Sequence, residues 1–231
     1  VVAEPSVIKP AVAPPVQPEE KSPAHLLVEK LAAELKGSPR NHKVRLELGS
    51  QYENYALEGK GAKETFPVKL GTGDYRVLVL ENIGGTSYRI IASANFTLQA
   101  TNEFGPYLKP NPHVNYNDGM SCIQFSRNLV SGLSSDAEKA KAIYNWVRSN
   151  IKYDHSKVDT LPAGYLPNPE TTFTTRKGIC YDFASLLAAM CRANGIPAKL
   201  IIGTADGISG LHAWNNVYFD GAWHRYDAST A

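Results

Sequence analysis

The sequence predicts an α+β protein in which an all-β half precedes a half with helices followed by three strands. Between residues 43 and 101, hydrophobic residues alternate with others, as in strands that have one buried face. After residue 120 the hydrophobic spacing becomes helical, and it alternates again from residue 198. With 231 residues, 43% of them hydrophobic, the chain is long enough for one large domain or two small ones.

Four segments follow from this pattern. Residues 1–21 hold five prolines and no aromatic residue, which is typical of an extended linker. Residues 22–39 are expected to form a short helix that begins at Ser22-Pro23 and ends near Gly37. Residues 40–104 are expected to form a β-module, and residues 105–231 a catalytic domain.

The β-module is expected to be a small antiparallel sandwich of immunoglobulin-like form. Turn clusters at 59–61, 71–73 and 83–85 separate the alternating segments. Those segments are Val44/Leu46/Leu48, Phe66/Val68/Leu70, Tyr75/Val77/Val79, Tyr88/Ile90 and Phe96/Leu98. None of the glycines forms a phosphate loop, so this module is expected to be a spacer or binding module.

The second half is expected to contain three helices, a long loop and three strands. The helices are Met120–Leu133, a helix that starts at the capping box Ser135–Glu138, and Cys180–Asn194. The loop covers residues 153–175, and the strands cover 198–203, 212–219 and 222–228. A core helix packed on an antiparallel sheet is the expected result.

Composition excludes several classes of function. The net charge of +2, with no run of Lys and Arg longer than two, argues against a nucleic-acid partner. No stretch approaches the roughly 20 apolar residues that a membrane span needs. No His or Cys lies at metal-ligand spacing from another, so neither metal nor cofactor is expected. The chain opens with Val and a Pro-rich stretch, from which we expect a secreted or cell-surface protein whose signal peptide was removed.

Cys180 is the strongest candidate nucleophile. It follows the loop residues 176–179 and stands at the first position of a predicted helix, where free amide groups and the positive end of the helix dipole favour a thiolate. A lone cysteine is more often a small core residue, so a catalytic role for Cys180 requires partner residues.

A predicted hairpin supplies those partners. Asp220-Gly221 is a strong two-residue turn between two alternating segments. With that turn, His212 and Asp227 lie on the same face of the hairpin as diagonal neighbours, whose side chains can meet. A four-residue loop would keep this parity and a three-residue loop would destroy it. Asp227 can therefore hold one ring nitrogen of His212 and leave the other for Cys180.

The other candidates are weaker. His224 falls on the opposite face of the hairpin, and the remaining histidines, His25, His42, His113 and His155, lie in linker or loop surroundings. Cys122 and Cys191 are expected in the core, with a disulfide between them as an open alternative. Asp182 is interpreted as a first-turn acid that suits the helix dipole.

Three ordered motifs resemble those of the transglutaminase-like superfamily over about residues 120–231. They are Thr175–Ala198 around Cys180, Leu211–Val217 around His212, and Trp223–Asp227. The three central residues lie 32 and 15 residues apart, which also suits that family. The resemblance implies a papain-like layout, in which a helix carries the nucleophile and a sheet carries the base and acid.

By this resemblance Cys180 attacks an amide carbonyl, His212 moves the proton and Asp227 orients His212. The backbone N–H of Cys180 and a second donor would hold the oxyanion, with Tyr153, Tyr165 and Trp214 as candidates for that donor or for substrate contact. The calcium dependence of the animal enzymes is not implied, since no acidic loop stands out.

The expected function is acyl transfer through a thioester at Cys180. Water as the acceptor makes a secreted bacterial cysteine protease or amidase, which we favour, and a lysine amine makes a crosslinking transglutaminase. The substrate is expected to be a protein or peptide, such as a cell-surface or cell-wall peptide. A surface binding module with an inactive triad is the alternative of a different class, and the oligomeric state is open.

Overall fold

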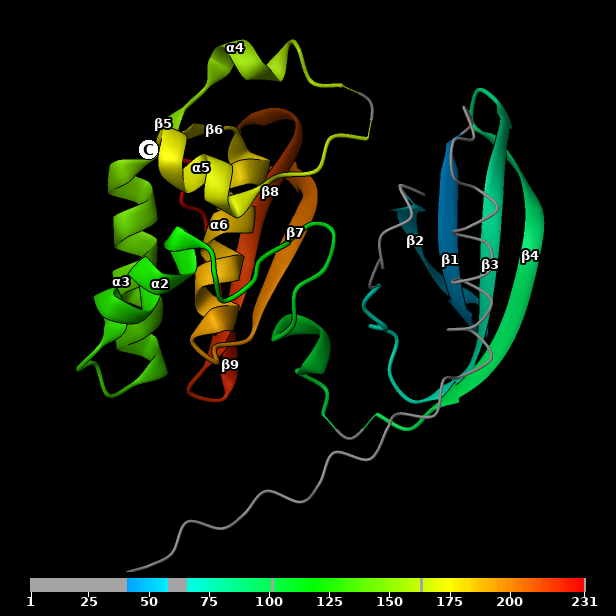
Figure 1. Ribbon diagram of the computed structural model, residues 1–231, viewed down its shortest axis with the longest axis horizontal. Helices are drawn as coiled ribbons and strands as arrows, with labels where there is room; N and C mark the ends of the chain where they lie inside the picture. Colours follow the sequence, from blue (N-terminus) through cyan, green and yellow to red (C-terminus); the bar gives the residue numbers. More distant parts are fainter. Residues whose placement is uncertain (1–40, 58–65, 101, 163, 231) are drawn as a thin grey trace, which may run out of the picture.

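The computed structural model describes residues 41–57, 66–100, 102–162 and 164–230. The expected linker 1–21, the helix 22–39 and the turn cluster 59–61 lie outside these residues. Figure 1 shows two parts side by side, a β-sheet built from the first half and a mixed α/β unit built from the second. No helix in the described part of the chain is long and apolar enough to cross a membrane.

The first part is a four-stranded antiparallel sheet in the order β2-β1-β3-β4. The strands are β1 (His42–Leu48), β2 (Gln51–Leu57), β3 (Gly73–Gly84) and β4 (Ser87–Leu98). One face is buried by alternating side chains such as Val44, Tyr75 and Val79, and the segment 66–70 packs on this core without joining the sheet. Alternation thus places one face inward, as expected for a half-buried sheet.

The sandwich expected here is not confirmed, because the described residues of this half form one sheet. The prediction of a strand at Phe66–Leu70 was wrong: this segment pairs with no strand, although Phe66, Val68 and Leu70 pack on the core. The strand β2 was missed, since Gln51-Tyr-Glu-Asn places few hydrophobic residues inward. The two short strands expected between 88 and 98 are one strand, β4.

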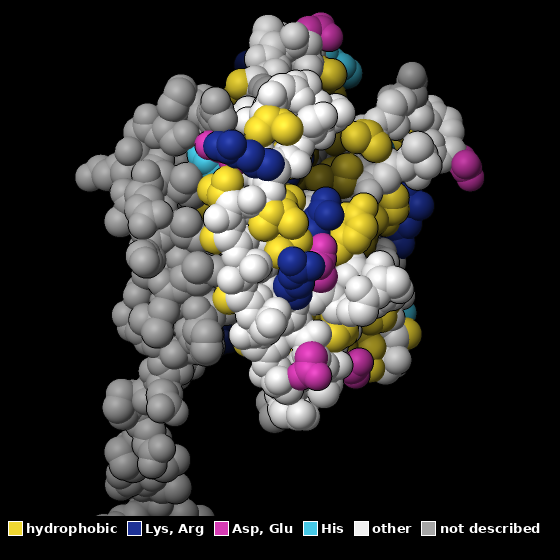
Figure 2. Space-filling view, turned by 90° about the vertical axis from the view of Figure 1, so that its right-hand side faces the viewer, with side chains coloured by type: hydrophobic (Ala, Val, Ile, Leu, Met, Phe, Trp, Pro, Cys, Tyr) yellow, Lys and Arg dark blue, Asp and Glu magenta, His cyan; other side chains and the backbone are white. Residues whose placement is uncertain are grey.

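The outward face of this half mixes hydrophobic and charged side chains (Figure 2). Ile83 and Ile90 are more than half exposed, while Arg89 and Glu81 form an ion pair with a 2.6 Å contact. Singly exposed hydrophobic residues of this kind are normal on a protein surface.

The connection to the second part contains the short 3₁₀ turn η1 (Gly105–Tyr107). Two helices follow, α2 (Ser121–Val130) and α3 (Asp136–Asn150), close to the predicted positions. The predicted capping box is confirmed, because the Ser135 hydroxyl accepts from the Glu138 N–H and the Glu138 carboxylate accepts from the Ser135 N–H.

The predicted loop 153–175 was wrong in part. It contains the one-turn helix α4 (His155–Val158) and the helix α5 (Pro169–Thr175), which the Asn168 side chain caps. Two short parallel strands, β5 (Lys152–Tyr153) and β6 (Lys177–Gly178), hold the two ends of this region together.

The centre of the second part is the helix α6 (Cys180–Ala193), which packs between α2 and α3 on one side and a three-stranded antiparallel sheet on the other (Figure 1). The sheet has the order β7 (Ala198–Ala205), β8 (Ile208–Phe219), β9 (Ala222–Tyr226). From Asp182 to Arg192 every residue of α6 is buried. The predicted core helix on an antiparallel sheet is confirmed.

The turn between β8 and β9 has the predicted two-residue form. Phe219 pairs with Ala222, and both Asp220 (φ 50°) and Gly221 (φ 78°) have the left-handed conformation of a type I′ turn. The register then places Asn215 opposite Tyr226. This pairing fixes which face each side chain of β9 occupies.

Candidate active site

His212 and Asp227 form a direct pair on the β8–β9 hairpin. Nε2 of His212 lies 2.7 Å from Oδ2 of Asp227, and the His212 ring is almost fully buried. A carboxylate can only accept a hydrogen bond, so Nε2 carries the hydrogen. In the neutral ring this leaves the lone pair on Nδ1, which can act as a base.

Further hydrogen bonds fix the carboxylate of Asp227. The Ser229 hydroxyl donates to Oδ1 over 3.0 Å, and the Ser229 N–H donates to the same oxygen over 3.3 Å. The backbone carbonyl of Asp227 also accepts from the Tyr144 hydroxyl of α3. Asp227 is therefore held from two sides, and its direction toward His212 is restricted.

Cys180 is the first residue of α6, as predicted, and it is half-buried with a free thiol. The N–H of the preceding Ile179 is taken by the Asp182 carboxylate over 2.9 Å. The amide groups of the first helical turn and the positive end of the helix dipole point toward this tip of α6.

α6 and β8 run in the same direction. The Asn215 side chain on β8 donates to the carbonyl of Ala184 on α6 over 2.9 Å, and at the other end the Tyr218 N–H donates to the carbonyl of Pro197, just beyond α6. Cys180 and His212 each lie on the N-terminal side of the Asn215–Ala184 contact. Both therefore belong to the same end of the helix–strand pair.

The Tyr153 hydroxyl lies next to Cys180. Burial raises the pKa of Tyr153, the negative charge of the Cys180 thiolate raises it further, and a hydrogen bond with the Cys180 backbone N–H lowers it. The parallel pairing of Tyr153 with Gly178 produces this placement, since Gly178 comes two residues before Cys180. His155 also lies nearby, with its ring centroid 4.9 Å from that of Tyr153.

The other two aromatic candidates have partners of their own. The Tyr165 hydroxyl contacts the carboxylate of Asp182 and the ammonium group of Lys157. The Trp214 ring lies alongside the His212 ring at 6.2 Å, with the Arg225 guanidinium 4.6 Å above it. His224 stacks on Phe219, on the predicted face opposite His212.

Cys122 and Cys191 are both fully buried and free, so the alternative of a disulfide between them is wrong for this structure. Burial raises the pKa of each thiol to about 12, assisted at Cys122 by the Glu170 carboxylate. Such thiols are poor nucleophiles at neutral pH.

Asp182 has partners that its sequence position alone did not predict. It is fully buried, and its carboxylate contacts Lys157 and Tyr165, which lie in the region expected to be a plain loop. The available signal was its position: an acid at the third residue of a helix whose neighbours are almost all hydrophobic is buried with them and needs a cation or donors.

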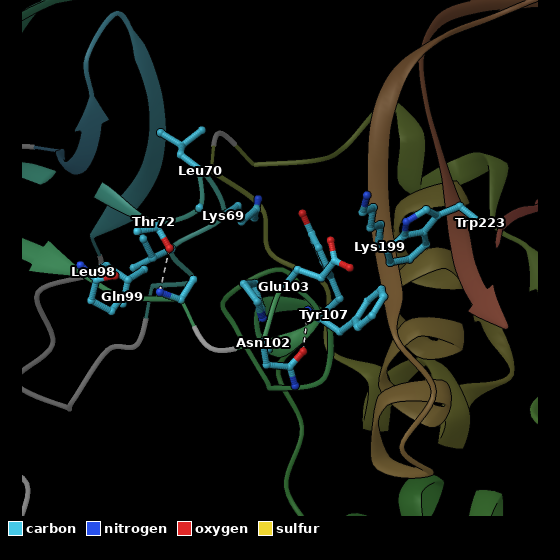
Figure 3. A pocket seen from close by; sticks show the side chains of 16 residues that line it. Lys69, Leu70, Thr72, Leu98, Gln99, Asn102, Glu103, Tyr107, Lys199 and Trp223 are labelled. Atoms are coloured by element: carbon cyan, nitrogen blue, oxygen red, sulfur yellow. Dashed lines mark hydrogen bonds between the residues drawn. The ribbon is translucent and has the colours of Figure 1, made fainter. Parts of the chain in front are cut away.

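A separate hollow of about 700 Å³ lies between the two parts of the molecule (Figure 3). Figure 3 shows Lys69, Leu70 and Thr72 on the side of the first sheet, Lys199 and Trp223 on the opposite wall, and Glu103 and Tyr107 between them. Cys180, His212 and Asp227 do not line it. This hollow is thus distinct from the candidate active site.

A helix that begins at a cysteine and packs on a sheet bearing a histidine–aspartate pair has the layout of papain-like proteins. Residues 123–228 match the model of the Transglutaminase-like superfamily. The matched residues contain all three of the motifs on which the predicted resemblance depends.

Relatives include the mouse (Mus musculus) kyphoscoliosis peptidase, 30% identical over 112 residues, which are 44% of this chain and 17% of that protein. A UPF0252 family protein of Methanocaldococcus jannaschii is 33% identical over 117 residues, covering 46% of this chain and 33% of that protein. The chain thus spans a third or less of these curated relatives.

Among solved structures, a candidate cysteine protease from Cytophaga hutchinsonii superposes with a TM-score of 0.50 and 21% identity. The match covers 84% of this chain and 68% of that one. At this level of identity the likeness shows a shared fold.

Proposed function

We propose that this protein is a thiol-dependent acyl-transfer enzyme that acts on peptide or side-chain amide bonds through a thioester at Cys180. The observation that carries the proposal is the His212–Asp227 pair, which leaves Nδ1 of His212 as the basic atom. The strand that bears His212 packs along the helix that begins at Cys180. The match of residues 123–228 to the model of the Transglutaminase-like superfamily is consistent with this chemistry.

The helix–strand packing places the elements that carry the thiol and the ring side by side. Cys180 precedes Ala184 by one helical turn, about 6 Å along the axis. His212 precedes Asn215 by three strand residues, about 10 Å. Since Asn215 and Ala184 are hydrogen-bonded and the two elements run in the same direction, the two groups lie at similar heights.

The reaction follows from these roles. Nδ1 of His212 takes the proton of the Cys180 thiol as the sulfur attacks the amide carbonyl carbon. When the C–N bond breaks, His212 gives that proton to the leaving amine, and the acyl group stays on sulfur. Water then attacks the thioester, His212 takes a proton from it, and the C–S bond breaks to release the acid.

The oxyanion of each tetrahedral intermediate would be held by the Cys180 backbone N–H and the Tyr153 hydroxyl. These two groups lie close together, because a hydrogen bond with the Cys180 backbone N–H lowers the pKa of Tyr153 against the larger effect of burial. The Tyr165 hydroxyl is engaged by Asp182 and Lys157, so we take Tyr153 forward as the second donor. Removing one such donor typically costs about 3 kcal/mol in the barrier.

Water is the proposed acceptor, which makes the protein a cysteine protease or amidase. The name of the mammalian relative, a peptidase, is consistent with this choice. Secretion from a bacterial cell is also part of the proposal and rests on the Pro-rich composition of residues 1–21.

Selective alkylation tests the nucleophile. At pH 6, iodoacetamide should label Cys180 at least about a hundredfold faster than Cys122 and Cys191, because those thiols are buried and their pKa is raised. Peptide mapping by mass spectrometry measures the three rates, and protein unfolded in urea provides the reference in which they converge. Equal rates in the native protein would contradict the enzyme.

Two matched histidine variants test the base. His212→Asn should lower the alkylation rate of Cys180 and abolish peptide hydrolysis, whereas His224→Asn, on the other face of the same hairpin, should leave both close to wild type. Mass analysis after addition of a peptide and a primary amine separates hydrolysis from transamidation. Amide-linked adducts in place of free acid would reassign the protein as a transglutaminase.

A further inference from the structure

We infer that Asp182, Lys157 and Tyr165, here called the Asp182 cluster, act as positioning residues that fix the Tyr153 hydroxyl beside Cys180. This inference deepens the proposed function and rests on it. It assigns a role to a buried carboxylate and to a segment of chain that the catalytic steps themselves do not use.

The Asp182 carboxylate is completely buried two residues after Cys180. A buried carboxylate is costly unless hydrogen bonds and an opposite charge compensate it. Oδ2 accepts from the Ile179 N–H over 2.9 Å and from Nζ of Lys157 over 2.6 Å. Oδ1 accepts from the Tyr165 hydroxyl over 2.5 Å.

Lys157 and Tyr165 also bind each other. Nζ of Lys157 donates to the Tyr165 hydroxyl over 2.6 Å and lies 4.5 Å from the centre of the Tyr165 ring. Three side chains thus form a closed triangle, in which Tyr165 donates to the acid and accepts from the cation. Each donor has a defined acceptor, so the arrangement is geometrically restrictive.

In its described residues, the segment between Tyr153 and Leu166 is attached mainly by this cluster, by the Asp154 N–H bond to the Gly178 carbonyl and by the edge contact of Tyr165 with Tyr181. None of the described residues from 152 to 166 is buried, and α4 is a single turn without a buried residue. Hydrophobic burial therefore contributes little to its position. The Asp182 carboxylate holds this segment at two points, through Lys157 in α4 and through Tyr165 eight residues later.

The segment that contains Lys157 and Tyr165 starts immediately after Tyr153. The Asp154 N–H donates to the Gly178 carbonyl over 2.8 Å, and Lys157 follows Tyr153 by only four residues. Gly178 is constrained by the same cluster, because a Cβ there would lie 2.5 Å from the Cβ of Asp182. The acid, the glycine and the tyrosine strand are consequently packed as one unit beneath the tip of α6.

The functional consequence concerns acylation more than thiol reactivity. Alkylation by a small electrophile needs an accessible thiol and the base that ionises it, whereas attack on a carbonyl also needs the oxyanion donor in place. Loosening the segment should let the Tyr153 hydroxyl move away while Cys180 and His212 keep their places. The two reactions should then respond differently to the same substitution.

The test uses Tyr165→Phe and Lys157→Met, with Lys157→Arg as the conservative variant and Asp136→Asn as a control that breaks an exposed pair on α3. Hydrogen exchange of the peptide 154–168 should rise about tenfold or more in the first two variants, while α6 stays protected. Their acylation by p-nitrophenyl acetate should fall about tenfold or more, and alkylation by iodoacetamide should stay within about twofold. Lys157→Arg should recover much of the acylation rate.

Unchanged exchange in both variants overturns the inference, as does raised exchange with an unchanged acylation rate. Equal losses in acylation and alkylation also overturn it, since they indicate a general disturbance of the tip of α6. Failure of the proposed function is read separately, in wild-type protein whose Cys180 is neither acylated nor preferentially alkylated.

Discussion

The two ends of α6 carry the same kinds of residue in different surroundings. Each end has a cysteine beside a buried charged side chain, Cys180 with Asp182 at the start and Cys191 with Arg192 at the end. The acidic Asp182 near the N-terminus of α6 and the cationic Arg192 near its C-terminus both interact favourably with the helix dipole. The cysteines differ: Cys191 is fully enclosed, and Cys180 is half-buried.

The partners of the two charges explain this difference. Arg192 donates to the backbone carbonyls of Ala198 and Lys109 over 3.0 and 2.7 Å, which joins α6 to β7 and to the connection between the two halves. Burial lowers its pKa to about 10. Asp182 instead binds side chains of an exposed segment. The C-terminal end of α6 is therefore enclosed in the core and bonded to neighbouring segments, whereas the N-terminal end leaves the Cys180 thiol partly accessible to solvent.

The largest expected effect comes from exchanging the two thiols for alanine. Cys180→Ala should reduce peptide hydrolysis by at least about 10³-fold, because the covalent step is lost, with little change in stability. Cys191→Ala should keep most of the activity and lose about 1 kcal/mol of unfolding free energy through a small cavity. Activity assays and urea denaturation measure the pair, and the reverse pattern would contradict the assignment.

Removing the acid at the N-terminal end should cost stability. Asp182→Ala leaves the Lys157 ammonium and the Tyr165 hydroxyl without their acceptor, and breaking a buried pair costs about 3–5 kcal/mol. We expect a value at or below the lower limit, about 2–3 kcal/mol, because Lys157 is partly exposed to solvent. Asp136→Ala, at an exposed pair, should stay within about 0.5 kcal/mol. A similar small loss at both sites would argue against the cluster.

Replacing Arg192 at the C-terminal end of α6 should have a somewhat smaller effect on stability. Arg192→Met preserves the apolar stem but leaves two carbonyls without donors, at about 2 kcal/mol in total. Acylation of Cys180 should remain near wild type, since this end is remote from the thiol. A larger loss of acylation in Arg192→Met than in Lys157→Met would contradict the different roles assigned to the two ends of α6.

The last expected effect depends on pH and is an alkaline loss of stability from Cys191. Burial raises the pKa of its thiol from 9.0 to about 12, so the folded state holds the proton more tightly. The stabilisation is complete below about pH 9 and is lost as the pH rises toward 12, because the unfolded thiol ionises first. Denaturation midpoints between pH 8 and 11 should therefore fall less steeply in Cys191→Ala than in wild type.

The sequence predicted the hairpin and the pairing of His212 with Asp227 because a two-residue turn determines the facing of both strands. It predicted α6 from hydrophobic spacing and the Gly-Ile-Cys start. These features depend on neighbours close in sequence, where periodicity and turn chemistry are informative.

The errors arise where distant residues decide the structure. The segment Phe66–Leu70 alternates like a strand, yet it covers the core of the first sheet without strand partners. Asp182 resembled an ordinary first-turn acid because its partners, Lys157 and Tyr165, lie 25 and 17 residues away along the chain. Pairing at such separations is not visible in local patterns.

The tight turn at Asp220-Gly221 limits how the length of this chain can change. One extra residue there would move the carboxylate of Asp227 to the face of the hairpin opposite His212 and break the contact between Nε2 and Oδ2. Insertions at this site should therefore be tolerated only in steps of two. In a library of loop-length variants, active proteins should alternate with inactive ones as residues are added one at a time.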